Sequence, residues 1–150
     1  MPVTLRHAMT IAFAAAVFIL VSFLVARWLT AENRERTAVI DVLRAQAGGD
    51  SASMLAMLDG CSGDPRCRAV VARNTRGLRR PGAVRILRLD SSTAHALLAE
   101  SGPTRVAWDV GGTTLPVVQC VQVERRGVPL LGGEIVLRSI GPKISGSAAC

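Results

Sequence analysis

The stretch TAVIDVLRAQAGGD, residues 37–50, decides how this chain folds. Its apolar residues recur at three- and four-residue spacing and so share one stripe of a helix: Val39, Ile40, Leu43 and Ala47. Gly48 and Gly49 end this predicted helix, which begins near residue 27. Its polar face carries the charged residues Glu32, Arg34, Glu35, Arg36, Asp41 and Arg44. A helix with a single apolar stripe buries it, so the rest of the chain must supply a covering surface.

A run of 19 uncharged residues, AMTIAFAAAVFILVSFLVA, lies upstream at 8–26. As a helix it is about 28 Å long, close to the roughly 30 Å hydrocarbon core of a bilayer. We therefore predict an N-terminal tail over 1–7 and a transmembrane helix over 8–28. A cleaved signal peptide is the alternative, but the run exceeds the roughly 7–15 residues typical of such segments. Its candidate cleavage sites also place Leu24 and Leu29 where a small residue is required.

The flanking charges and the cysteines predict opposite orientations for this anchor. Arg6 precedes the run, whereas Arg27, Arg34 and Arg36 follow it, so the positive-inside rule would leave the domain in the cytoplasm. All four cysteines lie beyond the run, and disulfides form in oxidising compartments. We give the cysteines more weight. The interpretation is a cell-membrane protein with an extracytoplasmic domain over 29–144 and a flexible tail over 145–150.

Cys61 and Cys67 frame a turn that favours a disulfide. Asp64 is a good N-cap and Pro65 suits the first helical position, so Cys67 falls in the first turn of a helix. That arrangement brings the two Cα atoms within the roughly 4.4–6.8 Å that a disulfide needs. A zinc site is less favoured, because five residues separate the two cysteines and no histidine is near. A catalytic cysteine lacks an adjacent base, and two unpaired buried cysteines are the remaining alternative.

The remaining sequence predicts helices first and strands afterwards. A short helix is expected over 51–59, capped by Asp50, and another from Pro65 to about Gly77. Beyond residue 82 the pattern alternates and predicts strands over 83–90, 93–99, 105–110, 117–125 and 134–140. A hairpin loop is expected at 100–103 and a turn over 127–133. The alternation slips between Ile86 and Leu87, which indicates a bulge.

This order defines an α+β fold: an N-terminal transmembrane helix, then two or three helices packed on a curved antiparallel sheet of four to five strands. Such a sheet would cover the apolar stripe of the long helix. Cys120 falls inside one predicted strand, and Cys150 ends the tail. These two cysteines either pair with each other or leave Cys150 as a free thiol.

The stretch TAVIDVLRAQAGGD, followed by Met54-Leu55-Ala56-Met57-Leu58, resembles the opening of nuclear transport factor 2-like domains. The resemblance implies an amphipathic helix, a Gly-Asp break, a short apolar helix and then a curved antiparallel sheet that closes a cone. The predicted elements over 32–144 are compatible with that order. The family includes enzymes, binding modules and assembly domains, so the resemblance implies a fold and leaves the function open.

Enzymes with this fold that resemble ketosteroid isomerase or polyketide cyclases use a carboxylate base, sometimes with histidine, inside the cone. Asp90, His95 and Asp109 are the candidates for such a site. The chain contains no tyrosine, which excludes a tyrosine oxyanion donor. The plainer interpretation places all three residues in solvent or in turns, and we favour it. No nucleotide-binding, metal-binding or nucleophile motif occurs in the sequence, so no cofactor or metal is expected.

The formal net charge is +7, and arginines supply nearly all of the positive charge. Five of them follow one face of the predicted third helix and its end: Arg66, Arg73, Arg76, Arg79 and Arg80. This surface is suited to anionic lipid headgroups or an acidic envelope protein, and a plain solvated helix face is the alternative. Nucleic acid is a weaker expectation, because no binding motif accompanies the charge.

The sequence therefore predicts a single-pass protein anchored in the lipid bilayer that acts as a binding or assembly module without catalysis. Two alternatives stay open. One is a small pocket enzyme that uses Asp/His acid–base chemistry. The other is a basic domain that faces the cytoplasm and binds nucleic acid.

Overall fold

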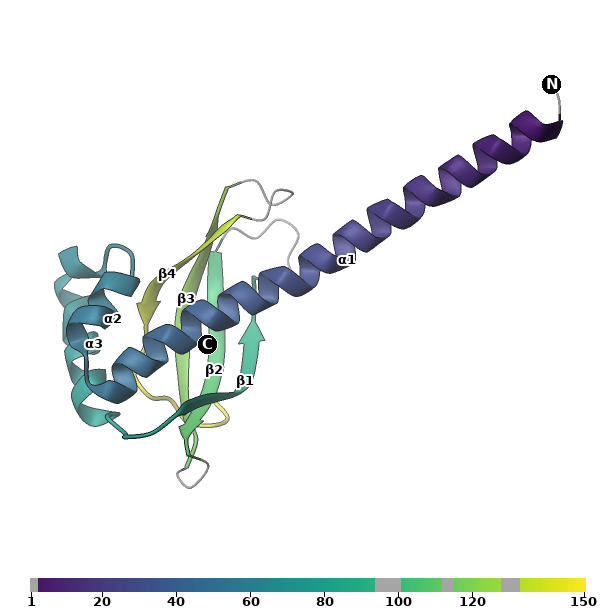
Figure 1. Cartoon of the computed structure of the whole chain (residues 1–150). Helices are drawn as coiled ribbons and strands as arrows, with labels where there is room; N and C mark the ends of the chain where they lie inside the picture. Colours follow the sequence, from purple (N-terminus) through teal and green to yellow (C-terminus); the bar gives the residue numbers. More distant parts are fainter. Residues whose placement is uncertain (1–2, 94–100, 112–114, 128–132) are drawn as a thin grey trace.

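The computed structural model describes residues 3–93, 101–111, 115–127 and 133–150, with the backbone alone at 3–6, 8 and 27–32. Helix α1, Val3–Gly48, is one uninterrupted helix of 46 residues, so the predicted anchor and the amphipathic helix are continuous. Within it, Met9–Ala26 is long and apolar enough to cross a membrane, with a mean hydropathy of 2.6 and none of it buried. The first half of α1 projects from the domain, and the second half packs on a sheet (Figure 1).

Two short helices and a 3-10 turn follow α1. Helix α2, Ser51–Met57, begins where the Asp50 side chain accepts a hydrogen bond from the Ser53 amide, which confirms the predicted cap. The 3-10 turn η1 spans Cys61–Gly63, and α3 spans Pro65–Gly77 with the predicted Asp64 cap and Pro65 in its first turn. The predicted helix over 51–59 stops at Met57, because Leu58 adopts extended backbone angles and forms an isolated bridge with Leu137.

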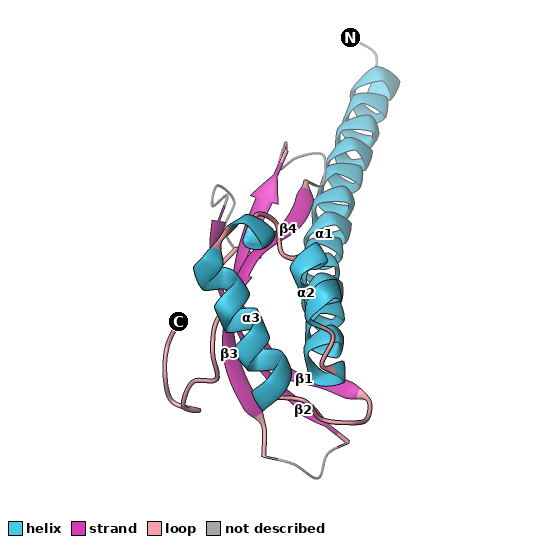
Figure 2. Cartoon of the chain, turned by 90° about the vertical axis from the view of Figure 1, so that its left-hand side faces the viewer, coloured by secondary structure: helices cyan, strands magenta, loops and turns pink. Residues whose placement is uncertain are grey.

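The described strands form a four-stranded antiparallel meander in the order β1-β2-β3-β4. They are β1 Val84–Ser91, β2 Ser101–Val110, β3 Val117–Arg126 and β4 Glu134–Ile140. The register of β1 against β2 shifts between Ile86 and Arg88, which confirms the predicted bulge. The helices gather along one face and one edge of the curved sheet, so the predicted α+β fold is confirmed (Figure 2).

The prediction of a hairpin loop at 100–103 is wrong for its described residues. Ser101, Gly102 and Pro103 belong to β2 and pair with β3. Proline is tolerated there because the last β1–β2 pair is Ser91 with Thr104, so this side of β2 is already a sheet edge at Pro103. Thr93 lies outside any strand, and the rest of the strand predicted over 93–99 falls outside the described residues.

The apolar stripe of α1 forms the centre of the core. Val39 and Leu43 are fully buried, Ala47 is nearly so, and Trp108 of β2 is the largest buried side chain. Glu35, predicted on the polar face of α1, is also fully buried. Its position explains this, because it lies one helical turn before Val39 and therefore continues the buried stripe toward the N-terminus.

Both cysteine pairs form disulfides. Cys61 joins Cys67 across the start of α3, with the Cα atoms 5.3 Å apart, as the turn chemistry predicted. Cys120 of β3 joins Cys150, so the alternative of a free Cys150 thiol is wrong. The C-terminal segment, predicted to be a flexible tail over 145–150, is thereby tied to the face of the sheet opposite α1 (Figure 2).

Candidate functional site

The candidate catalytic residues Asp90 and Asp109 are not brought together. Asp90 lies at the end of β1 opposite Arg105, whereas Asp109 lies opposite Arg85 near the start of that strand. Asp90 and Asp109 therefore do not share one site, because the two carboxyls occupy opposite ends of the β1–β2 pair. His95 lies outside the described residues.

Each of these carboxylates is held by arginine. Asp90 lies 2.8 Å from Nε of Arg88 and 3.5 Å from Nη1 of Arg105. The hydrogen bond from Arg88, more than the charge of Arg105, lowers the pKa of Asp90 below its ordinary value. Asp109 lies 3.0 Å from Nη2 of Arg85. A carboxylate stabilised in its ionised form is a poorer proton acceptor, so the surroundings of Asp90 suit an ion pair better than acid–base catalysis.

Glu35 is a buried carboxylate that sequence reasoning missed. Its Oε2 accepts hydrogen bonds from Ser91 Oγ at 2.8 Å and Thr93 Oγ1 at 3.2 Å, and its Oε1 accepts one from Thr104 Oγ1. Both carboxylate oxygens are therefore occupied, and Glu35 joins α1 to β1 and β2. The helical spacing of residues 35, 39, 42 and 46 was the signal that could have located it.

A second polar cluster crosses the core between α1 and the sheet. Gln46 Nε2 donates to Gln119 Oε1 at 2.8 Å, and Gln119 Nε2 donates back to Gln46 Oε1 at 3.2 Å. Trp108 Nε1 donates to the same Gln119 oxygen at 2.9 Å, and Gln119 Nε2 also reaches the Gly141 carbonyl. Because each side-chain polar atom of Gln46, Gln119 and Trp108 is hydrogen-bonded, this cluster joins α1 to the sheet.

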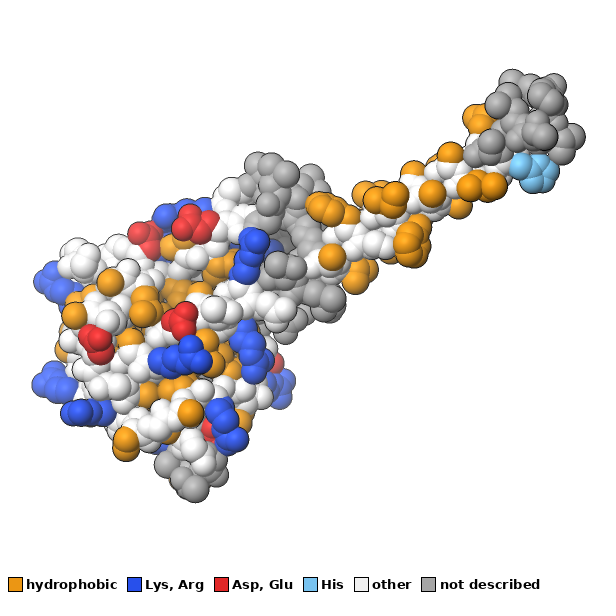
Figure 3. Space-filling model, in the orientation of Figure 1, with side chains coloured by type: hydrophobic (Ala, Val, Ile, Leu, Met, Phe, Trp, Pro, Cys, Tyr) orange, Lys and Arg blue, Asp and Glu red, His pale blue; other side chains and the backbone are white. Residues whose placement is uncertain are grey.

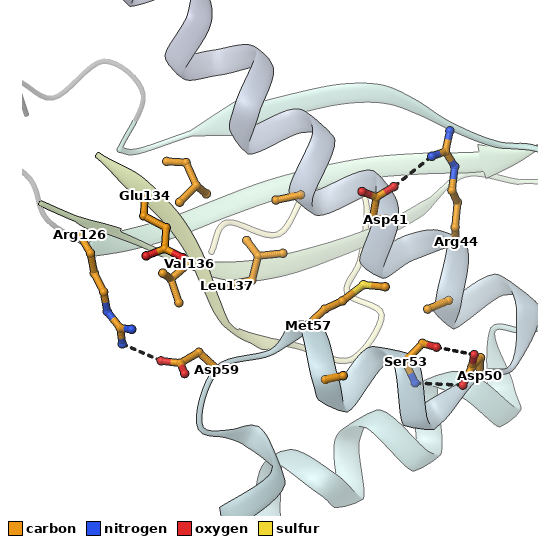
Figure 4. A pocket seen from close by; sticks show the side chains of 14 residues that line it. Asp41, Arg44, Asp50, Ser53, Met57, Asp59, Arg126, Glu134, Val136 and Leu137 are labelled. Atoms are coloured by element: carbon orange, nitrogen blue, oxygen red, sulfur yellow. Dashed lines mark hydrogen bonds and ion pairs between the residues drawn. The ribbon is translucent and has the colours of Figure 1, made fainter. Parts of the chain in front are cut away.

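The described residues do surround an open groove of about 680 Å³ between α1, α2 and the first half of β4 (Figure 4). Small and apolar side chains line its inner surface: Ala38, Ala45, Ala56, Met57, Ile135 and Leu137. Charged side chains stand around it: Asp41, Arg44, Asp50, Asp59, Arg126 and Glu134. The face that carries α1 accordingly shows hydrophobic surface bordered by charges (Figure 3). Concave sites of this kind, apolar with a few polar groups, are where proteins usually bind ligands.

The groove is acidic although the chain is basic. Four carboxylates and two arginines line it, a formal difference of −2 in a chain of net charge +7. Asp59 pairs with Arg126 at 2.6 Å and with Arg138 at 2.7 Å, and Asp41 pairs with Arg44 at 3.0 Å. Hydrogen bonds from the Ser53 side chain and amide lower the pKa of Asp50. Glu134 is exposed and, among the described residues, forms no ion pair.

One edge of β4 faces this groove. The Asp59 amide donates to the Leu137 carbonyl at 2.8 Å, so the backbone groups of Leu137 point away from β3. Backbone groups two residues apart in a strand point to the same side, so the N–H and C=O of Ile135 do too. In the described part of the chain, no backbone hydrogen bond joins these groups of Ile135 to a segment outside the sheet. No contiguous sequence motif marks this site, because its residues come from four elements, α1, α2, β3 and β4.

The predicted arginine surface lies at the end of the domain far from the projecting helix (Figure 1). Arg66, Arg73, Arg76 and Arg79 are exposed, and Arg80 is half-buried and donates to the Leu115 carbonyl at 3.0 Å. The Arg80 amide bonds the Ala47 carbonyl, which lies 21 residues beyond Ala26. At about 1.5 Å per residue this end stands roughly 32 Å from the apolar segment, several times the screening length of about 8 Å.

Among the residues that the structure describes, no group of three or more His, Cys, Asp or Glu side chains could hold a metal ion. The geometry thus defines a small α+β domain built on the continuation of an apolar helix, with an acidic groove beside a sheet edge. No protein-family model, curated protein or solved structure matches this chain.

Proposed function

We propose that this protein is a single-pass, membrane-anchored module whose extracytoplasmic domain binds another protein and has no catalysis of its own. The observation that carries the proposal is the double use of α1. Its first half is apolar and is not covered by other parts of the protein, and its second half is the core helix of a domain with two disulfides. Disulfides persist in oxidising compartments, which favours a domain outside the cytoplasm.

The binding role is supported by what the domain presents to solvent. The buried side chains of Glu35, Gln46 and Gln119 are hydrogen-bonded to other protein groups, whereas the groove combines apolar surface, charged residues and an unpaired strand edge. A headgroup-binding role for Arg79 and Arg80 is less well supported, since these residues stand far from the bilayer. An acidic protein partner suits that arginine surface better. The order of a long helix, two short helices and an antiparallel meander also supports the nuclear transport factor 2-like resemblance.

The alternative of a pocket enzyme is weakened by one observation. The carboxylates Asp90 and Asp109 are separated and ion-paired, and the buried Glu35 has both oxygens engaged by hydroxyl groups.

Thiol labelling tests the orientation. Intact cells that express the full chain are treated with a membrane-impermeant maleimide, with and without an impermeant reductant. We expect labelling of the domain only after reduction, because all four cysteines are paired. A matched control replaces the four domain cysteines with serine and carries Thr4→Cys, which we expect to label only after lysis. Domain labelling that requires lysis in the wild type would overturn the proposal.

A further inference from the structure

We propose that the groove between α1, α2 and β4 binds an extended, basic segment of a partner protein, which adds to the sheet as a strand beside β4. This inference rests on the proposed binding role and names its site and the chemistry of the partner. Three observations support it: the open backbone edge of β4, the small side chains opposite that edge, and the acidic character of the groove.

The sheet edge supplies the hydrogen bonds. β4 is a terminal strand, and its edge is covered at Leu137 by the amide of Asp59. The preceding residues Glu134, Ile135 and Val136 line the groove. Leu58 already forms a parallel bridge with Leu137, so the chain itself begins a fifth strand here and leaves it after one pair. Recognition of peptides by such an edge is a general mode, in which main-chain hydrogen bonds give the affinity.

The helices opposite leave room for the added strand. Ala38 and Ala45 face the groove from α1, and Ala56 and Met57 face it from α2. Met57 is 42% exposed, and its flexible thioether suits contact with varied side chains. The three lining residues of β4 before Leu137 match an added strand of about three residues, or roughly 10 Å at 3.3 Å per residue.

The charges select a basic segment. Among the described residues, the groove carboxylates Glu134 and Asp50 have no ion-pair partner, whereas Asp41 and Asp59 are paired with arginines (Figure 4). An acidic segment would be repelled here, although the chain as a whole attracts anions. Opposite charges thus distinguish the groove from the rest of the surface.

The position of the groove favours a protein segment over a lipid. Ala38 and Ala45 lie 12 and 19 residues beyond Ala26. Along the helix axis they stand about 18 and 28 Å from the end of the apolar segment. The polar layer of each leaflet is only about 5–8 Å thick, so the groove lies clear of the headgroups.

Peptide titration tests the charge preference. The full chain in lipid nanodiscs is titrated with a fluorescent blocked hexapeptide of alternating valine and lysine, and anisotropy is recorded. We expect saturable binding that the valine–glutamate hexapeptide does not show. Glu134→Lys should weaken it about three- to tenfold, whereas Ala69→Lys on the exposed side of α3 should leave it unchanged. Ala56→Trp should block the groove, with Ala69→Trp as its control. Equal affinity for both hexapeptides, or no effect of Glu134→Lys and Ala56→Trp, would overturn the proposal.

Backbone methylation tests the strand itself. Two isomers of the valine–lysine hexapeptide carry N-methyl groups on the valines or on the lysines, which block opposite edges of the strand. We expect one isomer to lose binding and the other to keep it, and the Ile135 amide to gain protection from hydrogen exchange when peptide is bound. Retention or loss in both isomers contradicts strand addition. Self-association of the free protein through the groove, seen by sedimentation and abolished by Ala56→Trp, would assign the groove to a second copy and overturn the proposal. Thiol labelling is independent of these results, so a failed groove leaves the anchored topology standing.

Discussion

The two disulfides offer a quantitative prediction, because they close loops of very different length. Cys120 and Cys150 are 30 residues apart, whereas Cys61 and Cys67 are 6 apart. Taking those separations as loop lengths, the chain-entropy model gives about 3.6 kcal/mol for the long loop and about 2.2 kcal/mol for the short one. Replacing each pair by serines should therefore lower the free energy of unfolding by unequal amounts, with the C-terminal pair costing about 1.4 kcal/mol more.

Trp108 makes the measurement direct. It is fully buried in the sheet, so its fluorescence reports unfolding of the domain once Trp28 is replaced by phenylalanine. The full chain in nanodiscs is unfolded with urea, and midpoints are compared at equal slope. With a slope of about 2 kcal/mol per molar urea, the two double variants should differ by about 0.7 M.

Hydrogen bonds also hold the C-terminal segment, in addition to the disulfide, and they bear on which result would refute this reasoning. Arg105 donates to the Ala148 and Gly146 carbonyls, and the Ile144 amide donates to the Val118 carbonyl. If those contacts hold the segment in the unbridged protein, the entropy argument still applies, since it concerns the unfolded chain. A C-terminal double variant that costs less than the Cys61/Cys67 variant would therefore refute the loop-length reasoning. The wild type treated with reductant is the control. Its urea midpoint should match that of a variant in which all four cysteines are replaced by serine.

Three further predictions concern the domain. Leu43→Ala should lower the free energy of unfolding by about 2–5 kcal/mol, whereas Leu87→Ala, at a residue 53% exposed on the β1 bulge, should change it by less than about 0.5 kcal/mol in the same urea assay. Glu35→Ala should cost about 2 kcal/mol or more, because it removes the acceptor of buried hydroxyl groups. Asp41→Ala on the same helix, where the carboxylate is half-exposed, is its control, and equal effects would contradict the assigned role. Hydrogen bonds from Arg126 and Arg138 lower the pKa of Glu124 below its unfolded value, so this carboxylate stabilises the fold above about pH 4.3 and loses that contribution as the pH falls through its folded pKa. Glu124→Gln should therefore make the free energy of unfolding less dependent on pH on the acid side. An unchanged acid-side dependence would contradict this role of Glu124.

Local sequence patterns were sufficient to predict a structural feature wherever that feature depends only on nearby residues. The cap at Asp64 and Pro65 located the start of α3, and the alternation over 134–140 gave β4 with its bounds. The slip near Ile86 located a bulge, because a register change of one residue moves side chains to the other face. Each of these signals lies within a few residues of the structure that it produces.

The features that the sequence did not predict depend on residues that are distant in the chain. Glu35 was placed on the solvent side because carboxylates seldom lie in cores, and the hydroxyls that hold it come from residues 56–69 positions away. Gly102 and Pro103 indicated a turn, yet both extend β2 where one side of that strand is an edge. The groove depends on residues from Ala38 to Leu137, so only the tertiary arrangement assembles it.

The continuity of α1 has a mechanical consequence. Because α1 is a single helix without a break, any rotation or axial shift of its apolar half is passed directly to the domain. One residue inserted between Ala26 and Glu35 would turn the domain by about 100° about the helix axis and move it about 1.5 Å outward, whereas a whole number of turns would nearly restore its heading. In the proposed membrane-anchored topology, the direction in which the domain faces its neighbours in the membrane plane is thus set by the phase of a single helix.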